Sequence, residues 1–308
     1  MPHDIPARSR PGAVPGAGHL TAFAPLDWWL LAAAALMWGS SFLLIEVGLE
    51  DLEPTAVAFL RLVFGVAALA CIPAARRPLR RSADWPWVAL LGLVWMAVPF
   101  LLFPLAQQSI ASSLAGMING AAPLFTAAIA AAWSRTVPAG WQAAGLAIGF
   151  AGVLTINWPA TQGASATVVG AALILLATFL YGVAFNLAEP LERRSGVLPV
   201  IWRAQIVAGL LLLPPGVAGL ADSTPTWPSM LAMVALGVLS TGLAFAAFTT
   251  LVGRVGASRG SVTVYFIPVV AVLLGVVVRD EVVATAAVVG TTLVLLGAFL
   301  TSRAGSRR

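Results

Sequence analysis

Residues able to carry out covalent or metal chemistry are scarce among the 308 residues of this chain. The two histidines, His3 and His19, both precede the first long apolar run, and Cys71 is the only cysteine. One cysteine forms neither an intrachain disulfide nor a metal cluster, and the parts of a Ser-His-Asp triad or a zinc site are missing. A G-x-x-x-x-G-K-[ST] nucleotide motif is also lacking. The sequence therefore predicts no catalytic residue, no metal and no cofactor, and it argues against an enzyme.

Groups suited to noncovalent binding are better represented, because aromatic and neutral polar residues recur within the apolar runs. Trp38 and Phe42 stand at places that Tyr181 and Phe185 occupy again later in the chain. Such residues could form an aromatic wall with hydroxyl and amide groups that orient a zwitterion. The alternative is that small neighbours such as Gly39 only let helices pack closely. The side chains predicted to line a binding site are Trp38, Ser41, Phe42, Trp95, Phe100, Phe103, Asn119, Tyr181, Phe185, Asn186, Phe245, Phe248, Ser261 and Tyr265.

Prolines interrupt three of the apolar runs. Pro99 and Pro104 lie in one run, whereas Pro123 and Pro268 lie near the middle of two others. A proline removes a backbone hydrogen bond and bends a helix, so these four positions are predicted hinges, with a static kink as the alternative. Asn119 lies one turn before Pro123, where its amide either contacts a bound molecule or bonds a neighbouring helix.

Ionisable residues inside the runs are few. Arg203 lies about a turn from a run's end and can reach the water interface. Arg61 lies deeper, so we expect it to pair with a carbonyl or an acid, and Glu46 is the predicted partner in a structural ion pair. No aspartate or glutamate lies near the middle of a run, which disfavours obligatory proton coupling through a buried carboxylate.

The elements that position these residues follow from composition. The chain is 60% hydrophobic and 9% charged, whereas a soluble domain carries about 25% charged residues. All 17 basic residues are arginines, and they lie mainly in short loops and at the termini. This pattern points to orientation in a lipid bilayer and not to nucleic-acid binding.

Ten apolar runs are each long enough to cross the membrane as a helix, since about 20 residues span a hydrocarbon core roughly 30 Å thick. The sequence thus predicts an all-α membrane protein with ten transmembrane helices. Residues 1–27 and 303–308 are expected to be cytoplasmic tails, the first of them disordered. We expect the helices near residues 28–47, 55–73, 86–108, 112–133, 141–157, 167–188, 198–215, 229–251, 258–278 and 283–302.

The second half of the chain repeats the first. At an offset of 145 residues, Phe100 matches Phe245 and Pro123 matches Pro268. The predicted domains are therefore two five-helix repeats, residues 28–157 and 167–302. Five helices are an odd number, so the second repeat must enter the membrane from the opposite side. Fourteen arginines then fall on one side and Arg279 alone on the other, which predicts that both termini are cytoplasmic.

At this point the motifs resemble those of a known family. Trp38-Gly39-Ser40-Ser41-Phe42, with Pro54 and Leu60-Arg61 after it, resembles the first two helices of the EamA family in the drug/metabolite transporter superfamily. Gly256-Ala257-Ser258-Arg259, with Pro268 and Asp280-Glu281 after it, resembles the corresponding part of the second repeat. One feature departs from the family pattern, because Trp133-Ser134-Arg135 lacks the acidic residue that usually follows the fourth helix. Only the second copy, with Glu281, retains it.

The resemblance implies a multi-pass secondary transporter of the bacterial-type inner membrane that works by alternating access. It implies a central cavity lined by the first, third, fourth, sixth, eighth and ninth helices. Its expected partners are the lipid bilayer and a small-molecule substrate, for which an exported amino acid is the leading hypothesis, as in exporters of the YddG type. The alternatives are another metabolite (a sugar derivative, a nucleoside or a drug) or a non-transporting membrane protein. We expect a monomer, with a dimer as the open alternative.

Overall fold

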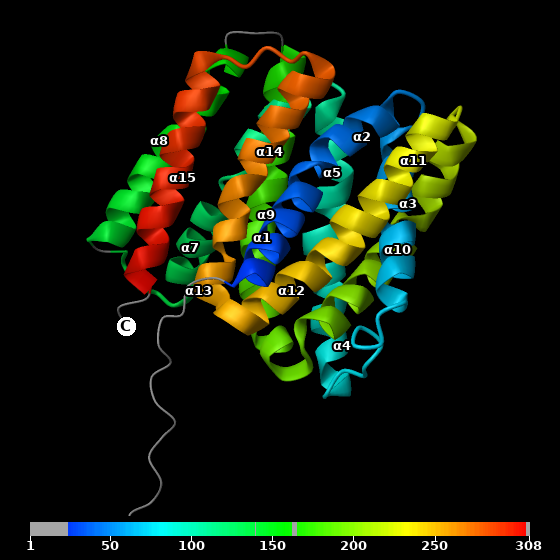
Figure 1. The fold of residues 1–308 in the computed structure, drawn as a ribbon, viewed down its shortest axis with the longest axis horizontal. Helices are drawn as coiled ribbons and strands as arrows, with labels where there is room; N and C mark the ends of the chain where they lie inside the picture. Colours follow the sequence, from blue (N-terminus) through cyan, green and yellow to red (C-terminus); the bar gives the residue numbers. More distant parts are fainter. Residues whose placement is uncertain (1–23, 139, 162–164, 306–308) are drawn as a thin grey trace, which may run out of the picture.

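The computed structural model describes residues 24–138, 140–161 and 165–305, and within these ranges the secondary structure is entirely helical (Figure 1). Seven helical runs in this part of the chain are long and apolar enough to cross a membrane. These runs are Pro25–Leu49, Ser82–Gln107, Ser112–Trp133, Thr167–Ser195, Val197–Ala221, Trp227–Val255 and Val262–Arg279. Three shorter apolar helices are Pro54–Ala70, Trp141–Ile156 and Thr285–Thr301.

The first half contains five of these helical runs, several of them interrupted. The first run breaks at Ser40, the third contains a π-helix, and the fourth breaks after Asn119. The elements are α1 (Pro25–Gly39), α2 (Ser41–Leu49), α3 (Pro54–Ala70), the 3₁₀ turn η1 (Ser82–Asp84), α4 (Trp85–Leu91), the π-helix η2 (Gly92–Ala97), α5 (Val98–Gln107), α6 (Ser112–Asn119), α7 (Ala122–Trp133) and α8 (Trp141–Thr161).

The second half has longer helices than the apolar pattern predicts. The helix expected at 167–188 continues to Ser195, and the one expected at 198–215 continues to Ala221. The extension of α9 is polar, and hydropathy locates only the apolar part of such a helix. The helix α10 continues past Pro214 and Pro215, which lie inside it. The elements are α9 (Ser165–Ser195), α10 (Val197–Ala221), α11 (Trp227–Ala235), the π-helix η3 (Leu236–Leu243), α12 (Ala244–Val255), α13 (Ala257–Gly260), α14 (Val262–Arg279) and α15 (Thr285–Gly305).

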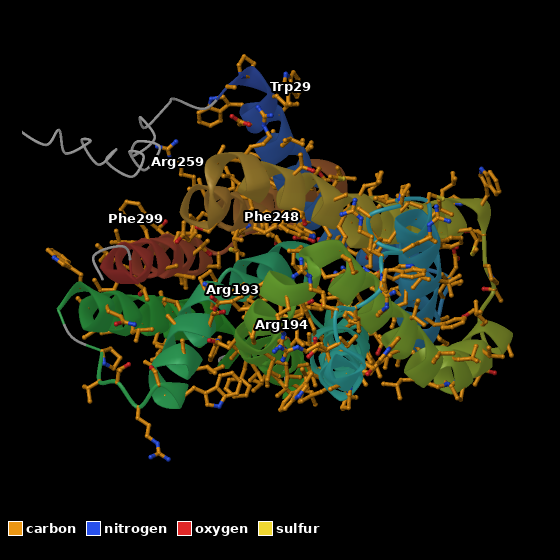
Figure 2. The ribbon with its side chains drawn as sticks, turned by 90° about the horizontal axis from the view of Figure 1, so that it is seen from below. Trp29, Arg193, Arg194, Phe248, Arg259 and Phe299 are labelled. Atoms are coloured by element: carbon orange, nitrogen blue, oxygen red, sulfur yellow. The ribbon has the colours of Figure 1, made fainter. Side chains whose placement is uncertain are left out.

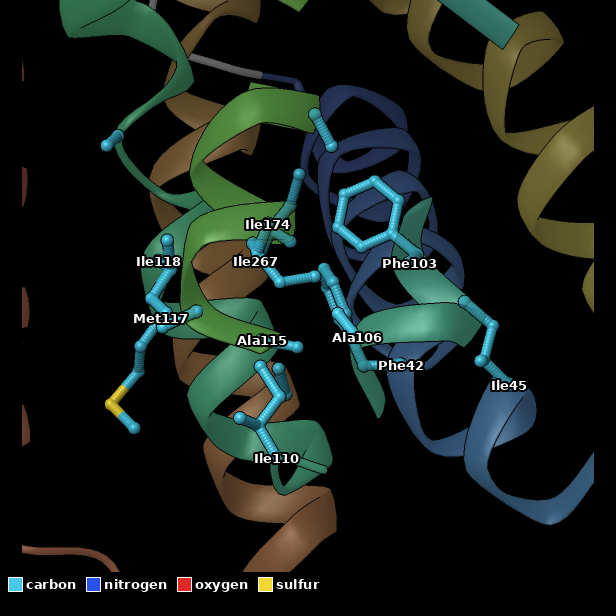
Figure 3. Packing of buried hydrophobic residues seen from close by; sticks show 14 of the residues in the cluster. Phe42, Ile45, Phe103, Ala106, Ile110, Ala115, Met117, Ile118, Ile174 and Ile267 are labelled. Carbon is cyan, nitrogen blue, oxygen red and sulfur yellow. The ribbon is translucent and has the colours of Figure 1, made fainter. Parts of the chain in front are cut away.

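Helices from the two halves are interleaved. In Figure 1, α8 and α15 lie side by side at one edge, α3 and α10 lie together at the opposite edge, and α1, α9 and α14 run between them. A large buried cluster joins the halves in the middle of the molecule (Figure 3), where Phe42 and Phe103 from the first half pack with Ile174 and Ile267 from the second. Burial of such apolar side chains holds the two halves together.

Ion pairs and hydrogen bonds between the two halves gather at both ends of the helical bundle. At the lower end in Figure 1, the start of α1 meets the end of α12 through Asp27 and Arg254, with Oδ1 and Nε 2.5 Å apart. At the same end, Arg194 Nη2 lies 3.0 Å from Asp84 Oδ1. Figure 2 is seen from below and labels Arg194 together with Arg193 and Arg259.

The opposite end is joined by a second set of contacts. Arg279 Nε lies 3.2 Å from Glu46 Oε1, and the same guanidinium also contacts Glu50. The loop after α2 meets the loop after α10, where Thr226 Oγ1 donates to Asp51 Oδ2 at 2.5 Å. Each end is thus fastened by polar contacts between elements of different halves.

Candidate functional site

Eight aromatic side chains form a continuous row through the interior, and we call this set the aromatic row. Neighbouring ring centroids are 5.1 to 6.1 Å apart, within the range in which edge-to-face and offset pairs attract. In order, the rings belong to Phe248, Trp38, Phe245, Trp95, Phe185, Tyr181, Phe103 and Phe42. All eight are among the residues predicted from the sequence to line a binding site.

The row is assembled from both halves of the chain. Trp38 at the end of α1 contacts Phe245 of α12 at 5.5 Å with an interplanar angle of 75°. Trp95, on the π-helix η2, meets Phe185 of α9 at 5.3 Å and 88°. Neither half alone could form this row, so it lies where the two halves of the chain meet.

Burial changes along the row. Phe42 and Phe103 are almost completely buried, whereas Phe185 is 37% exposed. Phe185 and the half-buried Trp38, Tyr181 and Phe248 keep accessible apolar ring surface, and ring faces also attract cations. A small amphiphilic molecule with an apolar or cationic part could therefore be held against these rings.

Two of the polar residues predicted for the site, Asn186 and Ser41, donate hydrogen bonds to backbone carbonyls. Asn186 Nδ2 donates to Thr126 O at 3.0 Å and to Gly182 O at 2.8 Å, which ties α9 to α7. Ser41 Oγ donates to Trp38 O at 2.6 Å, across the break between α1 and α2. Asn119 Oδ1 is buried without a hydrogen-bond partner among the described residues.

The remaining predicted residues lie around α14 and α5. Ser261 immediately precedes α14, and Tyr265 packs at the margin of the buried cluster that includes Phe42. Phe100 on α5 lies beneath the guanidinium of Arg61, whose Cζ is 3.8 Å from the ring centroid. One buried contact was missed, because Gln107 Nε2 donates to Phe42 O at 2.8 Å and links α5 to α2. No sequence signal separates Gln107 from the adjacent Gln108.

The structure gives Arg61 and Glu46 partners other than the predicted ones. Glu46 pairs with Arg279 from the end of α14. Arg61 Nε donates to Thr241 Oγ1 at 2.8 Å. The predicted pair is corrected accordingly, since Glu46 lies near the end of α2 whereas Arg61 is buried within α3.

Of the four prolines predicted as hinges, two adjoin an irregular part of a helix and two lie inside a continuous helix. Pro99 follows the π-helix η2 at the start of α5, and Pro104 lies within α5. Pro123 begins α7 just after the break at Gly120, and Pro268 lies within α14. A methyl group added to Gly120 would lie 2.7 Å from Pro268 Cγ, so the break between α6 and α7 contacts the proline of α14.

The sequence of this chain is similar to those of known membrane transporters. The model of the EamA-like transporter family matches residues 27–158 and again residues 168–303. The chain belongs to the EamA-like transporter family. It is therefore a membrane transporter and not an enzyme, as the motifs around Trp38 and Pro268 predicted.

Two relatives and one solved structure are similar to this EamA-like transporter over most of its length. A probable terminal-alkyne amino-acid exporter of Streptantibioticus cattleyicolor is 29% identical over 89% of this chain and 93% of its own length. A probable amino-acid metabolite efflux pump of Escherichia coli K12 is 27% identical over 89% and 94%. A crystal structure that covers 91% of this chain and 98% of its own has a TM-score of 0.62 at 19% identity, which supports the fold alone.

Glu281, the acidic residue that this EamA-like transporter retains in its second half, caps a helix of the first half. Its Oε1 accepts from the Ser112 N–H at 3.0 Å and from Ser112 Oγ, and its Oε2 accepts from the Ser113 N–H at 3.0 Å. The two backbone N–H groups belong to the first turn of α6, where such groups have no acceptor within the helix itself. Burial alone would raise the pKa of Glu281, but the hydrogen bonds from Ser112 and Ser113 outweigh it and hold that pKa below its ordinary value.

Proposed function

We propose that this protein is a secondary transporter that exports small metabolites, amino acids foremost, by alternating access through a pathway between its halves. The observation that carries the proposal is the aromatic row, because it is built from both halves and combines apolar rings with few fixed charges. Transporters of this kind bind their substrate near the bilayer midplane, where the repeats meet. A row shared by both halves would change shape whenever the halves move relative to each other.

We propose further that ten helices cross the membrane as two inverted repeats, residues 28–157 and 167–302. The packing supports this, since corresponding pairs recur with the halves exchanged: α3 packs on η3 as α10 packs on η2, and α1 packs on α14 as α9 packs on α7. Arg135 and Asp280, 145 residues apart, both adopt the left-handed conformation, with φ of 52° and 53°. A shared backbone irregularity at matching places is expected of two copies of one unit.

We place both termini in the cytoplasm and the protein in the inner membrane of a bacterial-type cell. The arginine-rich loop between α3 and η1 meets the end of α9, because the Arg80 N–H donates to Ser195 Oγ at 3.1 Å. These segments share an end with Arg254 and its partner Asp27. Arginine-rich loops favour the cytoplasmic side. At the other end Arg279 is neutralised by Glu46 and Glu50.

Transport by reconstituted protein tests the proposal. Liposomes containing the purified chain are screened with radiolabelled amino acids, sugar derivatives and nucleosides. We expect amino-acid flux above that of empty liposomes, and loss of about tenfold or more in the Trp38→Ala variant, because it removes a ring that pairs with Phe245 and Phe248.

The matched control is Trp29→Ala on the same helix, because Trp29 is 74% exposed in the structure and outside the row. We expect its flux to equal that of the wild type. Equal losses in both variants would count against the aromatic row as the pathway, and amino-acid flux no higher than in empty liposomes would overturn the amino-acid assignment.

A further inference from the structure

Among the described residues, one buried cation inside the helical bundle forms no ion pair with an acidic residue. Arg61 lies on α3, within an apolar stretch, and is 6% exposed. Its Nε donates to the hydroxyl of Thr241, and its guanidinium lies over the ring of Phe100. Both neighbours are neutral. A full charge among apolar helices is costly unless something compensates it.

The acids near the helix ends are committed elsewhere. Asp27 pairs with Arg254, and Asp84 pairs with Arg194. Glu46 and Glu50 share Arg279, and Glu281 accepts hydrogen bonds at the start of α6. The ion pairs formed by the described residues therefore leave Arg61 without a carboxylate.

The surroundings of Arg61 contain further polar groups that are not fully used. Thr241 lies on the π-helix η3, and its hydroxyl donates to Leu236 O at 3.0 Å. Gln205 Nε2 donates to Thr241 O at 2.7 Å. Gln205 Oε1 is buried and has no hydrogen-bond partner among the described residues. Local π-helices are frequent at functional sites, and this one brings the polar groups of Thr241 to both Arg61 and Gln205.

We propose that Arg61 is the binding site for the carboxylate of the transported molecule. This inference rests on the proposed transport function and narrows its substrate class to carboxylates, amino acids among them. Nε donates to Thr241, so the two terminal nitrogens of the guanidinium are left to bind a carboxylate. The planar guanidinium matches the geometry of a carboxylate group. The Phe100 ring covers one face of the guanidinium and lies on the same helix as Phe103 of the aromatic row, so an apolar part of the substrate would extend toward that row.

Transport by proteoliposomes tests this with two panels of probes, the standard L-amino acids and the corresponding amino-acid amides. An amide keeps the side chain and the amine but loses the anionic charge. We expect the wild type to move amino acids and to discriminate against their amides by about 10-fold to 100-fold, the range of a charge-assisted hydrogen bond. The Arg61→Met variant is expected to lose that preference.

The matched control is Arg203→Met, since Arg203 also lies within an apolar helix but donates to the backbone carbonyls of Pro199 and Ala75. We expect this variant to keep the preference for acids over amides. Amides moved as fast as amino acids by the wild type would overturn the carboxylate site and leave the transporter intact. Failure of both panels in the wild type would overturn the amino-acid function, and the site with it.

Thermal melting distinguishes binding from a structural role. Arg61→Met orphans no buried hydroxyl, because Thr241 Oγ1 keeps its bond to Leu236 O. We therefore expect the substrate-free variant to melt no lower than the wild type, and to lose the upward shift in Tm that the amino acids produce in the wild type. A variant that melts lower yet keeps that shift would show that Arg61 is only structural. Should Arg61→Met fail to fold, Arg61→Gln removes the charge but keeps a polar side chain, and retention of the full acid preference by that variant would overturn the proposal.

Discussion

At the scale of single residues, aromatic positions were easier to predict than ionic partners. Six of the eight residues of the aromatic row pair at matching places in the two halves, namely Trp38 with Tyr181, Phe42 with Phe185 and Phe103 with Phe248. The partner of Glu46 could not be found in this way. Arg279 lies 233 residues further along the chain, and only the packed helices bring the two together.

Glu281 carries the first residue-scale prediction. Replacing it with alanine leaves the N–H groups of Ser112 and Ser113 without their acceptor, so we expect a loss of about 1 kcal/mol in the free energy of unfolding, typical of a lost helix cap. Thermal melts followed by tryptophan fluorescence in detergent measure the difference. An unchanged Tm would contradict the capping role.

The same residue makes stability depend on pH. The folded pKa of Glu281 lies below its ordinary value, so the carboxylate stabilises the fold above the unfolded pKa and loses this effect as the pH falls through the folded pKa. The gap in Tm between wild type and Glu281→Ala should therefore be full near neutral pH and shrink on acidification. A gap that widens in acid would mean that the protonated form makes the better cap.

At the scale of elements, the apolar runs predicted where the helices lie, but not their internal irregularities. The π-helices η2 and η3 lie within apolar runs, and in each the hydrogen bonds span five residues instead of four. Such an insertion leaves the hydropathy unchanged, so no pattern in the sequence reveals it. The proline hinges stay a prediction: Pro99 and Pro123 adjoin a π-helix or a helix break, whereas Pro104 and Pro268 lie inside continuous helices.

The contact between α6 and α14 yields an element-scale prediction. A methyl group at Gly120 would meet Pro268 Cγ at 2.7 Å, so Gly120→Ala should cost about 1–3 kcal/mol through overpacking. Gly253→Ala is the control, since that position on α12 has nothing within 4 Å of the added methyl. Thermal unfolding in detergent should show a lowered Tm for Gly120→Ala and an unlowered Tm for Gly253→Ala. Equal melting of both would show that the two helices are not held this closely.

At the scale of the whole molecule, the 145-residue offset carried more information than any single motif. It predicted which segments correspond, and the family model matches the chain twice, at residues 27–158 and 168–303. The sequence could not reveal how the halves interlock, because that depends on contacts such as α3 with η3 and α10 with η2.

Sidedness is tested by labelling with a membrane-impermeant maleimide. In a Cys71→Ser background, Arg77→Cys reports the loop after α3 and Asp222→Cys reports the loop after α10, and both positions are exposed. We expect Arg77→Cys to react only in inside-out vesicles and Asp222→Cys only in intact spheroplasts. Reaction of both from one face would rule out the inverted arrangement.

The edge formed by α8 and α15 constrains how such a molecule can move. A methyl group at Gly152 would lie 2.6 Å from Gly290 O, and one at Gly290 would lie 2.6 Å from Ile156 N. The backbones of α8 and α15 are thus in close contact, and sliding of one helix along the other would bring side chains of one into the backbone of the other. We therefore expect α8 and α15 to stay fixed relative to each other and the two halves to rotate about this edge. The largest displacements would then fall at α3 and α10, on the far side.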